Sequence, residues 1–415
     1  MSPRHTPDGN AADLLSSDRI LILGAGYGGL RVAQMLSKRL DRDDRPEITL
    51  LDRHPYHQVI TELPVAAGGR YAQSDVEIPL QKLVKDKHVQ LIQAEITSLD
   101  LANRRVVTAT GPVEYGTLVI ALGSVTAFFG VPGLEDHALT LKSVDDAEAV
   151  RERVDQAMAA SVGLIDPDTR EAVLTTIIGG AGLTGVELAG ELAEFIPKAA
   201  KEHGIDPHEP KIVLVEGGPS ILPGLAQSLQ VKASETLQDL NVAIRTSTRV
   251  TAADDEGVTI GAAGRINGRT LIWTGGIRAL PLLAQAGLPT AKNGQVIVDP
   301  YLWVTGYPGV YAIGDSAYVL EEGQSRPLPP TAQAALDHAE IVSYNIFAAR
   351  MGYSERSFRS RDKGLVVSVG TRQGVASLLH IPLTGRAVLA LKDLIEEQYR
   401  FEAAGFLGLG HRRHG

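Results

Sequence analysis

The sequence contains no cysteine, and this absence excludes whole classes of chemistry. Without thiols the chain has no disulfides, no thiolate metal ligands and no dithiol or persulfide redox chemistry. We expect no metal site.

Long apolar runs and basic clusters are also missing. No stretch approaches about 18 consecutive apolar residues, so we expect no membrane-spanning helix, although a position on a membrane surface stays open. The formal net charge of -9 argues against nucleic acid as a partner, because phosphate contacts need a clustered basic face. Residues 1–18 are polar and lack an apolar signal segment, which predicts a flexible N-terminal tail on a cytoplasmic protein.

The remaining composition is that of a folded chain. Hydrophobic residues make up 44% and charged residues 21% of 415 residues. A chain of this length exceeds a single hydrophobic core, so two or three domains are expected.

Residues 19–30, RILILGAGYGGL, predict a buried strand, a glycine turn and a helix. In a dinucleotide fold Gly24 permits the turn, Gly26 lets the backbone approach a pyrophosphate, and Gly29 packs the helix on the strand. The anion then lies at the positive end of the helix. A surface loop with three glycines is the alternative. It is disfavoured by a second apolar strand that ends in Asp52, where a carboxylate would accept from an adenosine ribose.

The same pattern recurs at residues 176–187. We expect its strand over 172–178, its helix over 186–195, and its acid at Glu216. Two such units imply two dinucleotides, or a duplicated fold in which one site is lost. The first is favoured because both units keep the glycines and the acid. A carboxylate at Glu216 repels a 2′-phosphate, so NAD(H) is favoured over NADP(H).

Two other segments bear on the site. Residues 53–64 are too polar and proline-broken for a core element, so we expect a loop, in which His57 either contacts the cofactor or is a structural histidine. Residues 308–315 predict a strand that ends on Asp315. The helix from Thr331 to about Arg350 begins with residues that a helix N-terminus favours, so its free N–H groups could face a polar ligand group.

These motifs together resemble the two-dinucleotide-binding flavoproteins, and most closely the type II NADH dehydrogenases, which are non-proton-pumping NADH:quinone oxidoreductases. The resemblance extends from residue 19 to about 399. It is carried by GAGYGGL, DRHPYHQVITELPVAAGG, IIGGAGLTGVELAGELAE, YAIGDSA, PPTAQAA and GLVVSVGTRQGVA.

The resemblance implies that the N-terminal unit binds FAD and the inserted unit binds NADH. The implied FAD contacts are Gly24, Gly26, Tyr27, Gly28, Gly29, Asp52, Arg53, Thr61, Ala121, Gly123, Gly314, Asp315 and Ala332. The implied NADH contacts are Gly180, Gly182, Leu183, Thr184, Gly185, Glu216 and Gly275. The candidate catalytic residues are Glu187, Gln333, Asp337 and Lys392. Glu187, Asp337 and Lys392 can each also be read as an ordinary surface or helix-end charge.

The implied fold is α/β, with two Rossmann-like domains and a C-terminal α+β segment. We expect a tail over 1–18, the FAD domain over 19–140 and 290–350, the NADH domain over 141–289, and a C-terminal segment over 351–415.

The implied reaction moves a hydride from NADH to FAD and two electrons from FAD to a quinone. Relatives that reduce disulfides or oxidise sulfide use cysteines beside the flavin, and this chain has none. Asp337 stands where many family members carry a second glutamine, which leaves the acceptor open. The alternatives are a reductase of ferredoxin or rubredoxin, which the acidic net charge disfavours, and a redox regulator with incidental turnover.

The C-terminal helix expected over 388–406 has apolar residues at near-helical spacing. Family members commonly lie on the membrane through such helices, which predicts peripheral attachment at the inner face of the cell membrane. Glu396, Glu397 and Glu402 interrupt its basic character, so packing on its own domain or in a homodimer is the alternative.

Overall fold

The computed structural model describes residues 18–40, 46–85, 87–261, 264–321, 324, 326–361 and 363–404. The chain forms two compact units. The first comprises the described residues up to 59, with 77–125 and 277–361; the second comprises 60–76, 126–276 and the described residues after 361. Each unit is therefore assembled from segments that lie far apart in the sequence.

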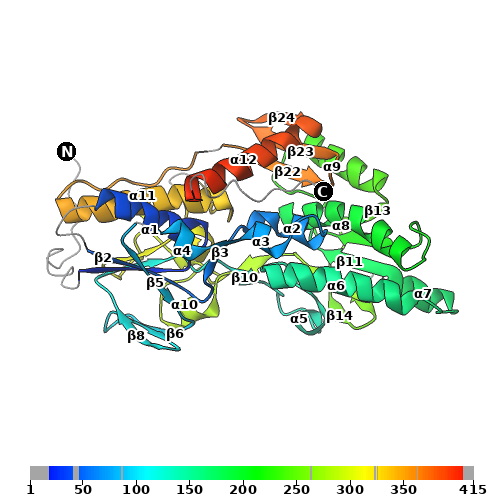
Figure 1. The fold of residues 1–415 in the computed structure, drawn as a ribbon, viewed down its shortest axis with the longest axis horizontal. Coiled ribbons are helices and arrows are strands. Elements are labelled where there is room, and N and C mark those ends of the chain that lie inside the picture. Colours follow the sequence, from blue (N-terminus) through cyan, green and yellow to red (C-terminus); the bar gives the residue numbers. More distant parts are fainter. Residues whose placement is uncertain are drawn as a thin grey trace. The chain divides into compact units, whose positions relative to one another are not determined.

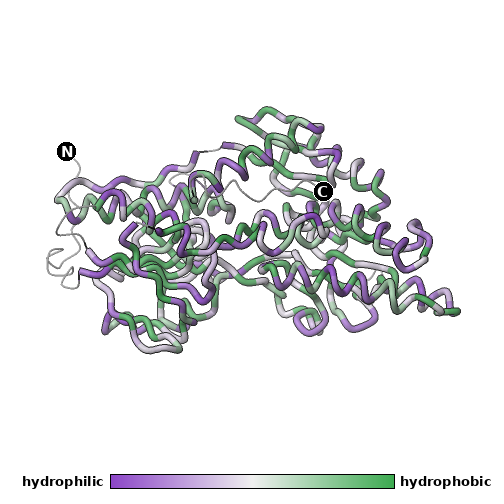
Figure 2. The backbone as a smooth tube through the Cα atoms, in the orientation of Figure 1, coloured by the Kyte–Doolittle hydropathy of each residue, from purple (hydrophilic) through white to green (hydrophobic). Residues whose placement is uncertain are grey.

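The first unit is organised around a parallel sheet in the order β20-β9-β1-β2-β5. Its strands are β1 (Arg19–Leu23), β2 (Glu47–Asp52), β5 (Val89–Gln93), β9 (Thr117–Ile120) and β20 (Val310–Ala312). Residues 20–23 of β1 are completely buried, as expected for a central parallel strand. In Figure 2, green hydrophobic stretches run through the region of this sheet, where Figure 1 labels β2 and β5.

Two long helices of this unit pack on each other, α1 (Tyr27–Arg39) and α11 (Ala332–Met351) (Figure 1). An antiparallel sheet lies alongside, formed by β6 (Ile96–Asp100), β7 (Arg105–Thr108) and β8 (Gly111–Glu114). The remaining elements are β3 (Tyr56–Gln58), β4 (Glu77–Pro79), α4 (Leu80–Leu83), β18 (Ile277–Arg278), α10 (Pro281–Gln285), β19 (Val296–Ile297), η4 (Gly314–Ser316) and β21 (Ala317–Tyr318). Strand β10 (Val125–Thr126) stands at a unit boundary.

The second unit repeats the parallel arrangement in the order β13-β12-β11-β17. These strands are β11 (Thr175–Gly179), β12 (Lys211–Val215), β13 (Val242–Arg245) and β17 (Thr270–Trp273). Its helices are η2 (Ile60–Glu62), α2 (Leu63–Ala67), α3 (Gln73–Val76), α5 (Leu134–His137), α6 (Val144–Ser161), α7 (Pro167–Leu174), α8 (Leu183–Glu202) and α9 (Gln227–Asp239). A small antiparallel sheet comprises β14 (Ala252–Asp254), β15 (Gly257–Thr259) and β16 (Arg265–Asn267).

The C-terminal segment completes the second unit. It contains β22 (Leu365–Val369), β23 (Gln373–Leu378), β24 (Ile381–Thr384) and α12 (Arg386–Ala404). Val367, Val369 and Val375 are buried in the same hydrophobic core as α8. The approach is close, because an ideal Cβ on Gly190 of α8 would lie 2.3 Å from the backbone nitrogen of Gly370.

The expected α/β class with two parallel sheets is confirmed, and three details of the expectation are wrong. Residues 172–174 end helix α7 and do not begin a strand. The expected loop over 53–64 contains β3 and η2, and leads into the buried α2. Helix α8 is longer than the expected 186–195. The units follow packing boundaries that differ from the expected cofactor domains, whose assignment stays a prediction.

No helix in the described part of the chain combines the length and the apolar character that crossing a membrane requires.

Candidate dinucleotide and redox site

The first glycine turn joins β1 to α1, and its glycines are sterically required. Gly24 has φ +94°, and an ideal Cβ there would lie 2.4 Å from the carbonyl oxygen of Ala121. A Cβ on Gly29 would lie 1.9 Å from the carbonyl oxygen of Gly24. A real Cβ cannot occupy either position, so the strand, turn and helix approach this closely only because both residues are glycine.

The N-terminus of α1 has open space where an anion would bind. Its N-cap is Gly26, which supplies no side-chain hydrogen bond, and a Cβ there would meet nothing within 4 Å. Helices α6 and α7, in contrast, are capped by the side chains of Ser143 and Asp166. The first-turn N–H groups of α1 thus fit the pyrophosphate of a dinucleotide.

A carboxylate and a histidine hold this turn from either side. Asp52 accepts from the backbone nitrogens of Ala25 (2.6 Å) and His54 (2.8 Å). The fully buried His57 places its Nδ1 2.8 Å from the carbonyl oxygen of Ala25, and its ring meets Tyr27 edge-on. His57 therefore has the structural role that the sequence left open.

A second turn of the first unit carries Asp315, which accepts from the hydroxyl of Ser124 at 2.7 Å. Beneath it lies His338, which is 2% exposed and whose Nδ1 accepts from the backbone nitrogen of Gly314 at 3.1 Å. Its Nε2 has no hydrogen-bond partner among the described residues. Burial lowers the pKa of His338 to about 4, and nearby Glu321 opposes this shift. His338 is therefore neutral at pH 7, with its proton on Nε2.

Helix α11 begins next to this turn and carries two candidate catalytic residues. Its N-cap Thr331 accepts from the backbone nitrogen of Ala334 at 3.1 Å. The side-chain amide of Gln333 donates to Asp337 at 2.8 Å, one helical turn later. Asp337 thus fixes the orientation of the Gln333 amide.

The glycine turn between β11 and α8 repeats the geometry of the first. Gly180 has φ +99°, and a Cβ there would lie 2.4 Å from the Cα of Gly275. A Cβ on Gly185 would lie 1.9 Å from the oxygen of Gly180, whereas one on the N-cap Gly182 would meet nothing within 4 Å. Glu216 accepts from the backbone nitrogens of Ala181 (2.8 Å) and Gly218 (2.7 Å), as Asp52 does in the first unit.

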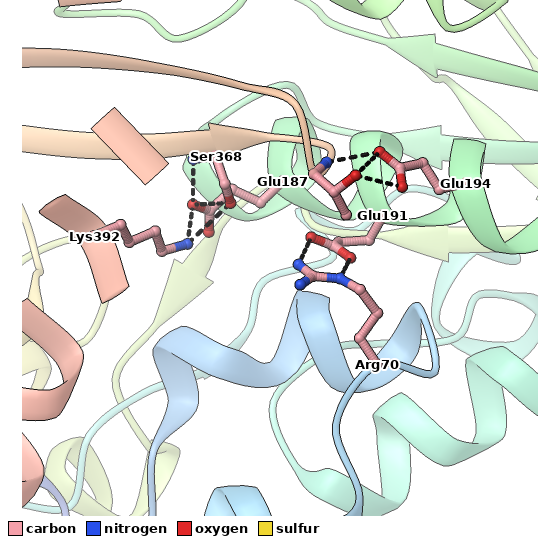
Figure 3. Close-up of polar contacts among 7 residues, drawn as sticks. Arg70, Glu187, Glu191, Glu194, Ser368 and Lys392 are labelled. Atoms are coloured by element: carbon pink, nitrogen blue, oxygen red, sulfur yellow. Dashed lines mark hydrogen bonds and ion pairs between the residues drawn. The ribbon is translucent and has the colours of Figure 1, made fainter. Parts of the chain in front are cut away.

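A buried polar cluster forms where α8, β22 and α12 meet (Figure 3). Glu187 accepts from the backbone nitrogen of Ser368 at 2.9 Å and from its hydroxyl at 3.0 Å. Lys392 forms an ion pair with Glu187 and donates to the Ser368 hydroxyl at 3.1 Å. We call Glu187, Ser368 and Lys392 the Glu187 cluster.

The charges around Lys392 favour its protonated form. Burial lowers the pKa of Lys392, but the carboxylates of Glu187, Glu62 and Glu396 outweigh burial and raise it. Burial raises the pKa of Glu396. The charge of Lys392 and a hydrogen bond with Thr61 oppose this rise. The cluster therefore holds a protonated lysine beside a carboxyl group that keeps its proton more readily than usual.

Two further acids on α8 tie neighbouring segments to this helix (Figure 3). Glu191, which is 1% exposed, accepts from Nε of Arg70 at 2.8 Å and also forms an ion pair with this arginine. Glu194 accepts from the backbone nitrogen and the hydroxyl of Thr371, each at 2.7 Å.

The predicted site residues divide between the two units. The first unit contains Gly24, Gly26, Tyr27, Gly28, Gly29, Asp52, Arg53, Ala121, Gly123, Gly314, Asp315, Ala332, Gln333 and Asp337. The second contains Thr61, Gly180, Gly182, Leu183, Thr184, Gly185, Glu187, Glu216, Gly275 and Lys392. The structure brings Glu187 and Lys392 into contact, and Gln333 and Asp337 into contact.

Several residues of these sites were not predicted from the sequence. Ser368 is 181 residues from Glu187, and nothing in its local sequence signals the contact. His338 directly follows Asp337, but its burial depends on tertiary packing. Only Glu396 had a local signal, because it lies four residues after Lys392 and hence on the same helix face.

Two glycine turns, each with an acid bound to its backbone, define the class of flavoproteins that bind two dinucleotides. Consistent with this class, residues 18–339 match the family model described as pyridine nucleotide-disulphide oxidoreductase.

Comparison with known proteins gives a narrower assignment. A protein from Staphylococcus aureus named type II NADH:quinone oxidoreductase is 32% identical over 398 residues, which are 95% of this chain and 98% of the relative. The structure of NDH2 from Plasmodium falciparum in complex with NADH has a TM-score of 0.83 at 21% identity, covering 94% of this chain and 97% of that one. Sulfide:quinone oxidoreductase from Aquifex aeolicus has a TM-score of 0.76 at 19% identity, covering 93% and 91%. The chain belongs to the type II NADH:quinone oxidoreductase family.

Proposed function

We propose that this chain is an FAD-dependent NADH:quinone oxidoreductase that does not pump protons. The observation that carries the proposal is the pair of glycine turns, each with an open helix N-terminus and a backbone-anchored acid. We assign FAD to the first unit and NADH to the second. FAD, when bound, supplies the two-electron chemistry that links NADH to the quinone.

The first unit's residues would hold FAD at three places. The first-turn N–H groups after Gly26 would bind the pyrophosphate, and Asp52 would bind the adenosine ribose. Asp315, oriented by Ser124, lies at the turn that would hold the ribityl chain. Gln333, whose amide orientation Asp337 fixes, would lie beside the flavin ring and the incoming quinone.

We assign proton supply to the Glu187 cluster. Lys392 carries a proton on Nζ, held between Glu187 and the Ser368 hydroxyl, and Glu396 lies beside it as a carboxyl with raised pKa. A quinone that takes up two electrons also takes up two protons. The Glu396 carboxyl would supply one of these protons, with Lys392 as the relay, and water would supply the other.

The C-terminal segment would place the enzyme at the inner face of the cell membrane, where NADH is available. Five large apolar side chains are exposed on β24 and α12, namely Ile381, Leu383, Leu394, Ile395 and Phe401. Exposed apolar groups on one segment are suited to the boundary between lipid headgroups and acyl chains. Sedimentation with lipid vesicles tests this, and Leu394→Glu should reduce it. Self-association of the chain without vesicle binding would favour a homodimer.

Anaerobic stopped-flow spectroscopy of the FAD-loaded protein tests the reaction itself. NADH should bleach the flavin absorbance rapidly, and a later mix with menadione should restore it rapidly. A matched Gly185→Ala variant should lose reduction by NADH but keep reoxidation by menadione after reduction with dithionite. Fast reduction followed by slow reoxidation would overturn the quinone assignment, whereas slow reduction of the parent protein would overturn the NADH assignment.

A further inference from the structure

The turn at residues 128–131 in the second unit has a backbone that its sequence does not favour. Val131 donates its backbone N–H to the oxygen of Phe128 at 3.0 Å, which closes a four-residue turn. Both central residues have positive φ, Phe129 at +55° and Gly130 at +68°. Such a turn favours asparagine or aspartate at the first central position, and a bulky aromatic residue there is an outlier.

The side chain at this strained position is not used by the hydrophobic core. Phe129 is 69% exposed, whereas Phe128 packs against the core cluster that contains Trp273. The turn is therefore anchored by Phe128, and its folding does not require a phenylalanine at 129. Residues with strained backbone conformations cluster at active sites and ligand-binding sites.

The exposed ring contacts the segment that follows β17, and this segment in turn packs on the second glycine turn. An ideal Cβ on Gly276 would lie 2.6 Å from Cζ of Phe129, and the oxygen of Gly276 accepts from the backbone nitrogen of Ala127 at 3.0 Å. The preceding residue, Gly275, packs on Gly180 of the glycine turn.

The strand order identifies which end of a dinucleotide would reach this ring. Strand β12, which leads to Glu216, lies on one side of β11, and β17 lies on the other. With the adenosine ribose at Glu216 and the pyrophosphate at Gly180–Gly185, the remaining half of the molecule extends over Gly275. That half is the nicotinamide riboside.

We propose that Phe129 packs against the nicotinamide ring of NADH and so gives the second unit a contact that ADP-ribose cannot make. This inference rests on the proposed function, since it requires NADH in the second unit. The ring offers an apolar surface suited to the nicotinamide plane.

The test compares two ligands that differ only in the nicotinamide. The FAD-loaded protein, with its flavin reduced beforehand by dithionite, is titrated calorimetrically with NADH and with ADP-ribose. Phe129→Asn should weaken NADH about tenfold, leave ADP-ribose unchanged and raise the unfolding midpoint, because asparagine tolerates positive φ. Phe129→Tyr should retain NADH affinity.

Leu379→Asn is the matched control, because Leu379 is also exposed (73%) with positive φ (+47°), at the turn between β23 and β24. It should gain stability and keep NADH affinity. An unchanged NADH affinity in Phe129→Asn, or an equal loss for both ligands, would overturn the contact. If the parent protein bound neither ligand, this result would rule out an NADH site in the second unit and would contradict the proposed function.

Discussion

The two glycine turns share the same steric plan but are supported differently. In the first unit, the fully buried His57 contacts the turn at Ala25. In the second, the half-buried hydroxyl of Thr274 donates to the oxygen of Gly180 at 2.9 Å, and the Trp273 ring fills the space over Gly179. The acid of the first turn is followed by Arg53, and that of the second by two glycines.

With FAD in the first unit and NADH in the second, as proposed, this difference matches the demands on a resident and an exchanging cofactor. FAD must stay bound through every turnover, so a turn supported by a buried imidazole suits it. NADH must enter and NAD⁺ must leave each time, so a turn bordered by Gly217, Gly218, Gly275 and Gly276 suits exchange.

The largest expected effect is the loss of cofactor binding when a single methyl group is added to either glycine turn. Gly29→Ala and Gly185→Ala both place a Cβ 1.9 Å from a backbone oxygen, so the turn must move in each case. We expect Gly29→Ala to purify without flavin. Gly185→Ala should keep its flavin and bind NADH at least 100-fold more weakly, about 3 kcal/mol.

Flavin absorbance and calorimetric titration measure these two results. If Gly29→Ala kept FAD and bound NADH poorly, the assignment of cofactors to units would be reversed.

Acid should weaken the first unit through His338. The folded chain keeps this histidine neutral until about pH 4, whereas the unfolded chain protonates it near pH 6.5. The contribution of neutral His338 to the free energy of unfolding is therefore complete above about pH 6.5. It is lost as the pH falls towards 4, which lowers that free energy by about 3 kcal/mol. Urea unfolding of the FAD-loaded protein at pH 7, 6 and 5, followed by flavin fluorescence, measures this loss.

His338→Asn should make that pH dependence shallower, because asparagine keeps an acceptor for Gly314 but does not titrate. His137→Asn, at an exposed histidine, is the control. Parallel pH profiles for the parent and His338→Asn would contradict the role of His338.

Neutralising Asp52 should weaken only the binding of FAD, and neutralising Glu216 should weaken only the binding of NADH. Asp52→Asn should weaken FAD by about 2 kcal/mol, because a charged acceptor is lost. Glu216→Gln should weaken NADH by a similar amount and increase the use of NADPH relative to NADH, since repulsion of the 2′-phosphate disappears. Steady-state kinetics with both nucleotides measure this ratio, which Asp52→Asn should leave unchanged.

The smallest effect concerns the hydroxyl that supports the second turn. Thr274→Val keeps the shape of the side chain but removes its hydrogen bond to Gly180, which should cost about 1 kcal/mol of unfolding free energy. Ser316→Ala is the counterpart in the first unit, where the hydroxyl donates to Gly123 at 3.1 Å. Chemical denaturation measures both losses, and an unchanged free energy of unfolding for Thr274→Val would contradict the role of this hydroxyl in supporting the turn.

The glycine turns and their acids could be predicted because their constraints are local. Gly24 and Gly29 are close in the sequence, and only glycine allows the backbone approaches that they make. Asp52 ends the strand next to β1, and Glu216 directly follows the strand next to β11, positions fixed by parallel pairing. The residues that line one edge of such a sheet therefore follow from strand order.

The rest depends on distant packing, which local patterns do not record. Residues 53–64 look too polar and too proline-broken for a core element, yet α2, which begins at Leu63 within this stretch, is buried against α6 and α8. Ser368 joins Glu187 only because β22 lies on α8. In the same way, the burial that lowers the pKa of His338 comes from packing that includes the Phe358 ring.

The interleaving of the two units also sets when each can fold during synthesis. The core around α8 needs Val367, Val369 and Val375, which leave the ribosome long after α8 itself. At a synthesis rate of about 5–20 residues per second, the apolar face of α8 stays uncovered for roughly ten seconds or more. The nascent chain must keep that face from aggregating during this interval, so chaperone dependence and sensitivity to C-terminal truncation should be concentrated in the second unit.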